Sequence, residues 1–577
     1  MPVDFKKYIM NNWRIIILSI LGIIFLFIYT WFPYQISRGE NVKFPSPDGT
    51  ANYFWAERYA AGKDLFYFEP LNLIADDVIV PRSVRSDNGE VKPVSFLGLI
   101  LIYGWIAKIF GSWIIIYLTP LLAVIGVLFF YGVIKRVFNE KIAFVSALMF
   151  LCLAPYWYYA SRSMFHNVLF IDLVLAGAWM WIYAAYNGTR IKRIKRMGAN
   201  YFLPFLSGAF IGLAIITRAS ELIWLAPAIL LAWAMYFKQI QWDKLTLFAC
   251  GVFLALMPMF YYNQILYGDF LKFGYNKPVA VETQSEIVVN NIGAENIDGI
   301  ATPPRSIAGL FAMTNKFIPA QINIKQAGKS FIYYYVIMFW HLFWPALFGG
   351  IWFLWNYKKQ NKGHWLYFAS FILVSVILVL YYGSWEIYDN PDKSSVTIGN
   401  SYTRYFLPMY IMSIPLAVLF IVKLSELLKK KYLIYGLQIV AIIAFFILNF
   451  QIAALCKEEG LLSMKNSLEE GVILGEEILP HIEPEAIIIS ERFDKIFWPE
   501  RKVIVGNFTG KEHNLQYQKL IEYGTPLYYY GFIFPEVDMN YLNDRRLKEH
   551  NLKIEPIKLS ESNRLGLYKL VKIPSGQ

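Results

Sequence analysis

Asp48 is the residue whose surroundings most favour chemistry. It lies in a Pro47-Asp48-Gly49 turn directly after the first long apolar run. From about Thr50 to Ala61, apolar residues recur at helical spacing, so we expect an amphipathic helix along a membrane surface. That helix would hold the carboxylate near lipid headgroups, where partial desolvation raises the pKa of a carboxyl group. Asp at such a position also commonly caps a helix, and that interpretation stays open.

The composition predicts that the elements around Asp48 lie in a membrane. Of 577 residues, 57% are hydrophobic and 17% are charged, and the mean hydropathy is +0.40. A soluble domain carries about 25% charged residues. The apolar residues form runs of roughly 18 to 25, the length of a spanning helix, without the alternation of a β-barrel. The net charge is +12, but the basic residues lie between apolar runs, which favours membrane lipids as partners and excludes nucleic acid.

Eleven apolar segments are expected to span the membrane. They are 15–34, 113–134, 142–160, 166–186, 201–217, 219–237, 245–266, 331–355, 365–382, 404–422 and 433–455. Basic residues mark the cytoplasmic side of a membrane. They cluster before the first segment, between the second and third, and at 190–196 after the fourth. We therefore expect an integral protein of the plasma membrane, with a cytoplasmic N-terminus and an extracytoplasmic C-terminus.

The apolar run 94–110 is interpreted differently. If it spanned the membrane, the basic segment 190–196 would move to the outer side. Lys108 interrupts the run and Gly111 ends it, so we expect a helix lying in the outer interface. The fold class is then a polytopic α-helical membrane protein with about 11 to 13 transmembrane helices.

The topology divides the chain into two domains. A transmembrane domain covers 1–455, with external loops at 35–112, 267–330 and 383–403, and an extracytoplasmic domain covers 456–577. In the second domain we expect a small α/β fold. Its predicted strands are 486–490, 503–506, 527–534 and 566–573, and its predicted helices are 514–523 and 540–550. The loop 267–330, rich in Gly, Asn and Pro, is a candidate lid.

The segment after the first span resembles the first external loop of the GT-C glycosyltransferases. Within that superfamily the segment is similar to the protein O-mannosyltransferases and the aminoarabinose transferases. The match is Pro47-Asp48, followed by Asn52-Tyr53-Phe54 and Arg58-Tyr59-Ala60. In that superfamily the loop carboxylate lies at the catalytic centre. Gly49 stands where the relatives often have a second acidic residue.

Four further matches follow in order along the chain. They are Lys92-Pro93, Ser161-Arg162, the segment Gly212–Arg218, and Arg404-Tyr405-Phe406-Leu407-Pro408. The expected topology places all of them at the outer face. Where the relatives carry an acidic residue shortly after Ser-Arg, this chain has Phe165, His166 and Asn167. The resemblance covers roughly 15–270 and the segment near Arg404.

The resemblance implies transfer of a sugar from a polyprenyl-phosphate donor to a protein, lipid or glycan acceptor at the outer face. Direct displacement predicts inversion at the anomeric carbon. Asp48 would act as the base. Donor phosphate would bind to cations, namely Lys92, Arg162, Arg218 and Arg404. Other expected substrate contacts are Asn52, Arg58, Arg82, His166, Asn167, Tyr405 and Glu386.

Several alternatives stay open. Asp48, Asp76 and Asp77 could bind Mg²⁺ or Mn²⁺, although an adjacent Asp pair is more often solvated surface. Each arginine could instead contact lipid headgroups, and the loop around Glu386 could simply be solvated. A transporter or lipid flippase is the second functional hypothesis, and a non-catalytic receptor is the third. The charges gather at the ends of spans rather than in their interiors, which favours surface chemistry over transport.

Overall fold

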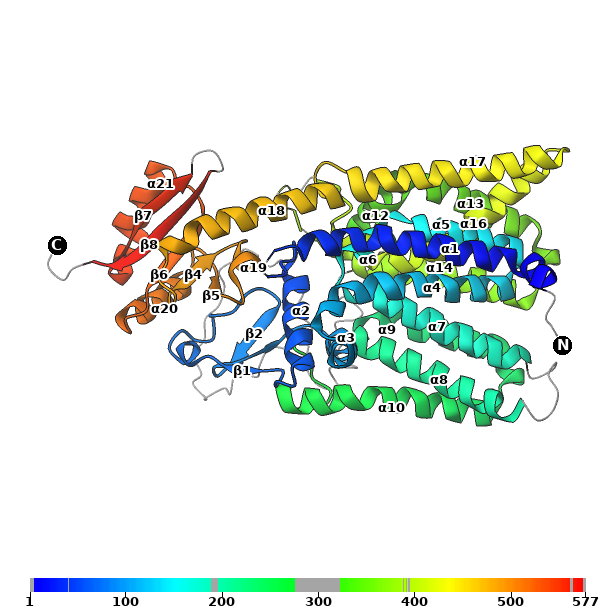
Figure 1. The fold of residues 1–577 in the computed structure, drawn as a ribbon, viewed down its shortest axis with the longest axis horizontal. Coiled ribbons are helices and arrows are strands. Elements are labelled where there is room, and N and C mark those ends of the chain that lie inside the picture. Colours follow the sequence, from blue (N-terminus) through cyan, green and yellow to red (C-terminus); the bar gives the residue numbers. More distant parts are fainter. Residues whose placement is uncertain are drawn as a thin grey trace.

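The computed structural model describes residues 5–39, 41–187, 196–275, 322–387, 389–390, 392, 395–560 and 564–573. A long helical bundle carries a smaller α/β domain at one end (Figure 1). Helix α1 begins at the opposite end of the bundle. Most of the candidate lid, residues 276–321, lies outside the described residues, as does the core of the basic segment at 190–196.

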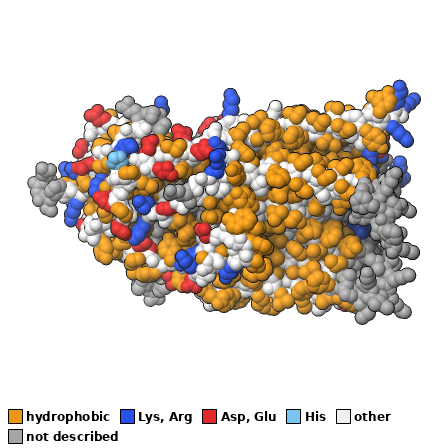
Figure 2. All heavy atoms as spheres, viewed as in Figure 1, with side chains coloured by type: hydrophobic (Ala, Val, Ile, Leu, Met, Phe, Trp, Pro, Cys, Tyr) orange, Lys and Arg blue, Asp and Glu red, His pale blue; other side chains and the backbone are white. Residues whose placement is uncertain are grey.

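Eight helices of the described chain are long and apolar enough to cross a membrane. They are α1 (Phe5–Ile36), α4 (Ile115–Val137), α7 (His166–Asn187), α9 (Leu222–Tyr236), α10 (Trp242–Tyr267), α14 (Lys362–Tyr381), α16 (Leu407–Glu426) and α17 (Lys431–Phe450). Hydrophobic side chains cover the outside of the bundle, and charged side chains gather on the α/β domain (Figure 2). The chain is an integral membrane protein.

The other three expected spans differ from a simple straight helix. Helix α8 (Arg196–Thr217) has an apolar part of only Tyr201–Thr217. The span expected at 142–160 is α5 (Glu140–Cys152) followed by α6 (Ala154–Arg162), with a bend of 52°. The span expected at 331–355 is α12 (Ile324–Phe331) and α13 (Trp340–Trp355), with a bend of 98°. Each bent pair covers the range of one expected span, and the bends themselves were not predicted.

The break between α5 and α6 has a local cause. Leu153 is extended, with φ −63° and ψ 116°, and Pro155 has no amide N–H for the helix ladder. The amide of Ala154, freed by the break, donates instead to Oδ1 of Asn449 in α17 at 2.7 Å. In this way the bundle satisfies a backbone donor that lipid could not.

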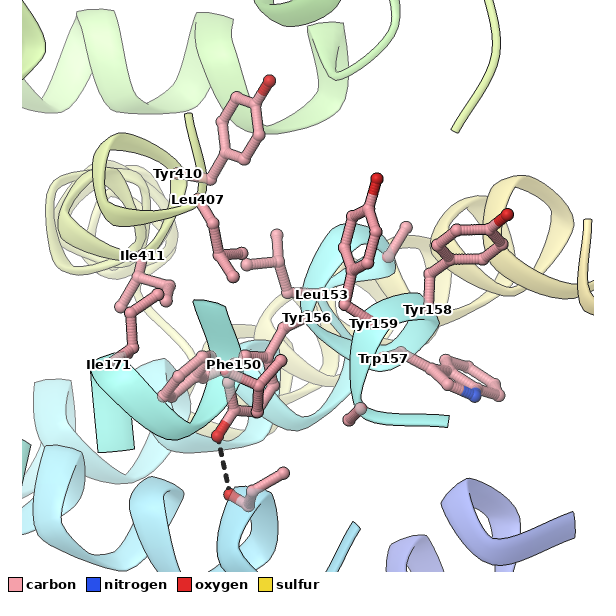
Figure 3. Close-up of a cluster of buried hydrophobic side chains, with 14 of the residues drawn as sticks. Phe150, Leu153, Tyr156, Trp157, Tyr158, Tyr159, Ile171, Leu407, Tyr410 and Ile411 are labelled. Atoms are coloured by element: carbon pink, nitrogen blue, oxygen red, sulfur yellow. Dashed lines mark hydrogen bonds between the residues drawn. The ribbon is translucent and has the colours of Figure 1, made fainter. Parts of the chain in front are cut away.

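Helix α6 is fixed in the bundle by a run of aromatic residues, Tyr156 to Tyr159. All four side chains are buried, and they point from α6 in different directions (Figure 3). The Tyr156 hydroxyl donates to the Ala123 carbonyl at 2.8 Å, and the Tyr159 hydroxyl lies 3.0 Å from that of Thr403. Arg162 therefore ends a firmly held helix.

The end of the bundle at which α1 begins is held by ion pairs. Arg14 lies 3.3 Å from Glu140, and Lys141 lies 3.8 Å from Glu426. These pairs bring together the start of α1, the start of α5 and the end of α16. The opposite end of the bundle bears the segment between α1 and α4 and the α/β domain (Figure 1).

The segment between α1 and α4, here called the first loop, folds over this end of the bundle (Figure 1). It contains α2 (Pro47–Ala60), a three-stranded antiparallel sheet of order β1-β3-β2, and α3 (Leu97–Phe110). The strands are β1 (Tyr67–Phe68), β2 (Val84–Asp87) and β3 (Glu90–Pro93). Helix α3 is the segment expected in the interface, and its 14 residues reach only about 21 Å, less than the thickness of the hydrocarbon core. A Cβ at Gly98 would lie 2.4 Å from the Thr217 amide nitrogen, so α3 packs directly on the end of α8.

Helix α18 (Leu461–Ile478) leads into the C-terminal domain. Its five-stranded sheet has the order β5-β4-β6-β8-β7, in which β5, β4 and β6 are parallel and β8 and β7 are antiparallel. The strands are β4 (Ile487–Ser490), β5 (Lys502–Val505), β6 (Leu527–Phe532), β7 (Leu552–Ser560) and β8 (Leu565–Lys572). The helices are α19 (Asp494–Phe497), α20 (Lys511–Glu522) and α21 (Glu536–Tyr541). The expected small α/β domain is confirmed.

Candidate active site

A cavity of about 1340 Å³ lies where the bundle, the first loop and the C-terminal domain meet. Its walls come from the start of α2, the ends of α6 and α7, the short helix α15 (Ser401–Tyr405), and α18 and α19. Asp48 and the three expected arginines all line it: Arg162, Arg218 and Arg404. Segments up to several hundred residues apart are thus brought to one site.

The Asp48 carboxylate faces this cavity and does not cap α2. Ser46 is the N-cap, because its Oγ accepts a hydrogen bond from the Gly49 amide at 3.1 Å. Asp48 Oδ1 instead accepts from the Ser83 hydroxyl at 2.6 Å, and Oδ2 lies 3.2 Å from Nη1 of Arg404. The helix begins at Pro47 rather than near Thr50. The capping interpretation was therefore wrong.

The pKa of Asp48 also differs from the expectation. Burial acts to raise it, but the Arg404 guanidinium and the Ser83 hydroxyl stabilise the carboxylate and hold the pKa below the ordinary value of 3.8. The expected rise of the Asp48 pKa was wrong, because the sequence did not reveal these two partners. At neutral pH the carboxylate is ionised.

Gly49 occupies the position at which the glycosyltransferases that this loop resembles often have a second acidic residue. A Cβ at this position would lie 3.1 Å from the Cβ and ring of Phe44, which is itself buried. Any longer side chain would have to displace Phe44. Asp48 is the only carboxylate in the first turn of α2.

The three arginines form a row with two aromatic rings between them. The Arg162 and Arg404 guanidinium groups lie 4.9 Å and 5.4 Å from the Phe165 ring. Those of Arg404 and Arg218 lie 5.3 Å and 5.0 Å from the Tyr405 ring. Cation–π contacts thus keep three like charges in one wall of the cavity.

Other expected contacts support this row. The Asn167 side chain accepts from Nη1 of Arg218 at 3.2 Å and donates to the Arg404 carbonyl at 3.2 Å. His166 places Nε2 3.0 Å from the Phe96 carbonyl. Asn167, His166 and Tyr405 all line the cavity. The structure therefore brings these three expected contacts to the site.

Lys92 is not brought to the site. Its ammonium lies 3.2 Å from Asp87 and from Glu90, and it donates to the Leu266 carbonyl at 2.8 Å. It is buried and does not line the cavity. The β2–β3 hairpin causes this placement, because its register sets Arg85 opposite Lys92 and Asp87 opposite Glu90. A role for Lys92 in phosphate binding finds no support in this geometry.

Three other expected contacts also lie outside the cavity lining. Asn52 is buried and bonds the Met164 carbonyl and the Ser95 hydroxyl. Arg58 donates to the carbonyls of Asp64 and Phe66. Glu386 is exposed. The contacts of Asn52 and Arg58 indicate that these two side chains stabilise the loop rather than bind substrate.

The candidate metal ligands are occupied by protein groups. Asp76 pairs with Lys519 at 2.8 Å, and Asp77 accepts from Ser86 and from the amides of Asn88 and Gly89. Within the described ranges, no three His, Cys, Asp or Glu side chains come together as a cation site. The described residues therefore offer no preformed cluster of ligands for the Mg²⁺ or Mn²⁺ that was considered possible.

Arg82 lines the cavity and ties the first loop to the C-terminal domain. It donates to Asp494 at 2.5 Å and to the Arg492 carbonyl at 2.9 Å. The Asp494 side chain is 1% exposed. We expect Arg82→Ala to lower the midpoint of thermal unfolding, because Asp494 would stay buried without its partner at a cost of about 3 kcal/mol. Lys511→Ala, which removes only an exposed pair with Glu549, is the control. Equal midpoints for both variants would contradict this account.

Comparisons with known proteins place this geometry in a fold family. No protein-family model matches the sequence, and no curated protein matches it. Solved structures do match. The Archaeoglobus fulgidus oligosaccharyltransferase tethered with an acceptor peptide superposes with a TM-score of 0.52 and 11% identity, over 99% of this chain and 76% of that one. ArnT from Cupriavidus metallidurans, bound to undecaprenyl phosphate, superposes with a TM-score of 0.52 and 10% identity, over 97% and 98%. The chain has the GT-C fold.

A third match is the archaeal oligosaccharyltransferase AglB from Archaeoglobus fulgidus with an inhibitory peptide and a dolichol-phosphate. Its TM-score is 0.51 at 10% identity, over 98% of this chain and 74% of that one. The GT-C fold expected from short motifs is confirmed. The likeness extends over nearly the whole chain, beyond the part in which the motifs were found.

Proposed function

We propose that this protein transfers a sugar from a polyprenyl-phosphate donor to an acceptor hydroxyl at the membrane surface. The observation that carries the proposal is the meeting of an ionised carboxylate with a row of three arginines in one cavity at the end of the bundle. Structures with the same fold hold undecaprenyl phosphate, dolichol-phosphate or an acceptor peptide. These lend support to a lipid-linked donor.

In the proposed reaction the acceptor oxygen attacks the anomeric carbon as Asp48 takes its proton. The bond from that carbon to the phosphate oxygen breaks, and the electron pair leaves with the phosphate. Arg404 and Arg218 stabilise the charge that develops on the phosphate. A single displacement inverts the anomeric configuration. The prenyl chain would stay in the lipid beside the bundle.

Arg404 connects the base to the leaving group. It holds the pKa of Asp48 down in the free protein, so the carboxylate is a weak base while it is paired with Arg404. A donor phosphate that draws the Arg404 guanidinium away would leave burial as the dominant effect on Asp48, and its pKa would rise. Donor binding would thus strengthen the base when the acceptor arrives.

The orientation is part of the proposal. The cavity and the C-terminal domain lie at one end of the bundle, and the start of α1 lies at the other (Figure 1). We place the cavity end at the outer face of the plasma membrane and the N-terminus in the cytoplasm, following the basic loops. Glu221 precedes α9 and pairs with Arg218 at 2.7 Å. This acid thus lies at the end of a span rather than in its interior, which weakens the transporter hypothesis.

The test is transfer itself. Purified protein is incubated with radiolabelled polyprenyl-phosphate sugars and membrane extract, and the protein, lipid and glycan fractions are counted. We expect label from at least one donor in one fraction, with inverted configuration. Absence of transfer from every donor, together with uptake of a lipid or solute into vesicles, would favour the transporter instead.

Ser83 is a positioning residue for Asp48 that no sequence motif indicated. Its backbone has φ 64°, and its hydroxyl donates to the carboxylate at 2.6 Å. We expect Ser83→Ala to lower kcat for transfer by about tenfold, because the lost hydrogen bond leaves the carboxylate free to turn. Ser86→Ala, which removes a similar bond to Asp77, is the control. Equal losses of kcat in both variants would assign Ser83 to loop stability alone.

A further inference from the structure

Two of the three arginines in the row form an ion pair with an acidic residue, and the third does not. Arg218 lies 2.7 Å from Glu221, and Arg404 lies 3.2 Å from Asp48. Arg162 is 6% exposed, yet no carboxylate of the described chain lies within 4 Å of its guanidinium. Its Nη1 donates to the Tyr158 hydroxyl at 3.1 Å, and its buried Nε has no partner. A buried arginine of this kind has hydrogen-bonding capacity for an anion.

A second cation reaches this end of the row from the C-terminal domain. Lys495 of α19 lines the same cavity and donates to the Pro45 carbonyl at 2.5 Å. It forms no ion pair in the part of the chain that the structure describes, because the neighbouring Asp494 is taken by Arg82. Two buried or half-buried cations of the cavity lining therefore have no ion pair among the described residues.

The electrostatics agree with an excess of positive charge. Burial, together with the charges of Arg82 and Arg162, lowers the pKa of Lys495 to about 8 against the opposing effect of Asp494. Such an excess is unfavourable in a partly desolvated site unless an anion compensates it. Of the nearby carboxylates that line the cavity, Asp48 is engaged by Arg404 and Ser83, and Glu458 and Glu459 accept from the Ser395 and Thr397 hydroxyls. Among the described residues, none of these three forms an ion pair with Arg162 or Lys495.

We propose that Arg162 and Lys495 form a second oxyanion site, which binds a phosphoryl group of a substrate at the junction of the bundle and the C-terminal domain. Guanidinium and ammonium groups are the usual partners of phosphate oxygens. The inference rests on the proposed function, in which Arg404 and Arg218 take the phosphate beside Asp48. The phosphoryl group at the second site would be the distal phosphate of a diphosphate donor or a phosphate of the acceptor.

The experiment measures binding to the purified full-length chain by calorimetry. The probes are farnesyl diphosphate, farnesyl monophosphate and inorganic pyrophosphate. The variants are Arg162→Gln and Lys495→Gln, and the control is Lys511→Gln, an exposed lysine of the same domain. We expect each test variant to weaken pyrophosphate binding by about tenfold, with no change in the control.

The outcomes separate the two proposals. If the test variants also bind farnesyl diphosphate about tenfold more weakly, but bind farnesyl monophosphate with unchanged affinity, the second site binds the donor. A loss confined to pyrophosphate assigns it to an acceptor phosphate. Wild-type affinity of both variants for every probe would overturn the second site, whether or not the lipids bind. If pyrophosphate binding is lost in the variants but the wild type binds neither lipid, the second site stands and the proposed donor is wrong.

Discussion

Asp48→Asn is expected to lower kcat for sugar transfer by about 10² to 10⁴, or roughly 3 to 5 kcal/mol in the activation barrier. The amide cannot take the proton of the acceptor hydroxyl. It is similar in size and can still accept from the Ser83 hydroxyl, so the loop should keep its conformation. Initial rates with a radiolabelled donor and a saturating acceptor measure the change.

The matched control for this substitution is Asp76→Asn in the same loop. Asp76 pairs with Lys519 at 2.8 Å and its side chain is 54% exposed, so its loss should leave kcat within about twofold. A bound donor of unchanged affinity would show that the Asp48 variant is folded. Retention of full transfer by the Asp48 variant would remove Asp48 from the chemistry.

Arg404→Gln is expected to have the second large effect. Loss of a guanidinium beside the developing phosphate charge should lower kcat by about 10² to 10³. The same change should move the acid limb of the pH profile of kcat/KM upward. In the native protein the pKa of Asp48 is depressed, so Asp48 stays ionised as pH falls until the pH drops below 3.8. Without Arg404, burial raises this pKa, and protonation inactivates the base at higher pH.

Arg404→Lys serves as the comparison, because it keeps the charge but not the planar fork. We expect it to restore the native acid limb while recovering only part of kcat. A pH profile that extends from about pH 8 to below 3.8, the upper bound of the native Asp48 pKa, gives both quantities. Identical acid limbs for the native protein and Arg404→Gln would show that Arg404 does not set the charge of Asp48.

The membrane-spanning helices could be predicted because each one is indicated by an apolar run within its own sequence. Each expected span corresponds to a described helix or bent helix pair, since apolar runs of sufficient length have few alternatives in a chain of this composition. The bends were missed. Pro155 gave a hint of one, but the bond from the Ala154 amide to Asn449 joins residues 295 positions apart.

In the first loop a usable signal was overlooked. Asn88 and Gly89 have φ of 52° and 83°, and Asn-Gly is the preferred pair for a two-residue hairpin turn. Recognising that turn would have placed Glu90 beside Lys92 and the Asp87–Glu90 pair across the hairpin. Lys92 would then have been expected to pair with these carboxylates rather than with a donor.

The C-terminal domain was also predicted only in part. Its buried strands were predicted from short apolar runs, but β7 was missed because Lys553, Glu555 and Lys558 make this edge strand appear polar. The contribution of Lys495 to the cavity could not be predicted from any local pattern in the sequence. It arises from packing between residues separated by more than 400 positions, such as Arg82 and Asp494.

The most direct measurement of the central claim is a cryo-electron microscopy structure of the full-length protein with a polyprenyl phosphate. The account predicts the phosphate in the cavity, with its oxygens within about 3 Å of Arg404 and Arg218 and the Asp48 carboxylate released from Arg404. The prenyl chain should leave the cavity toward the lipid. A phosphate bound at Lys92, or anywhere outside this cavity, would contradict the account.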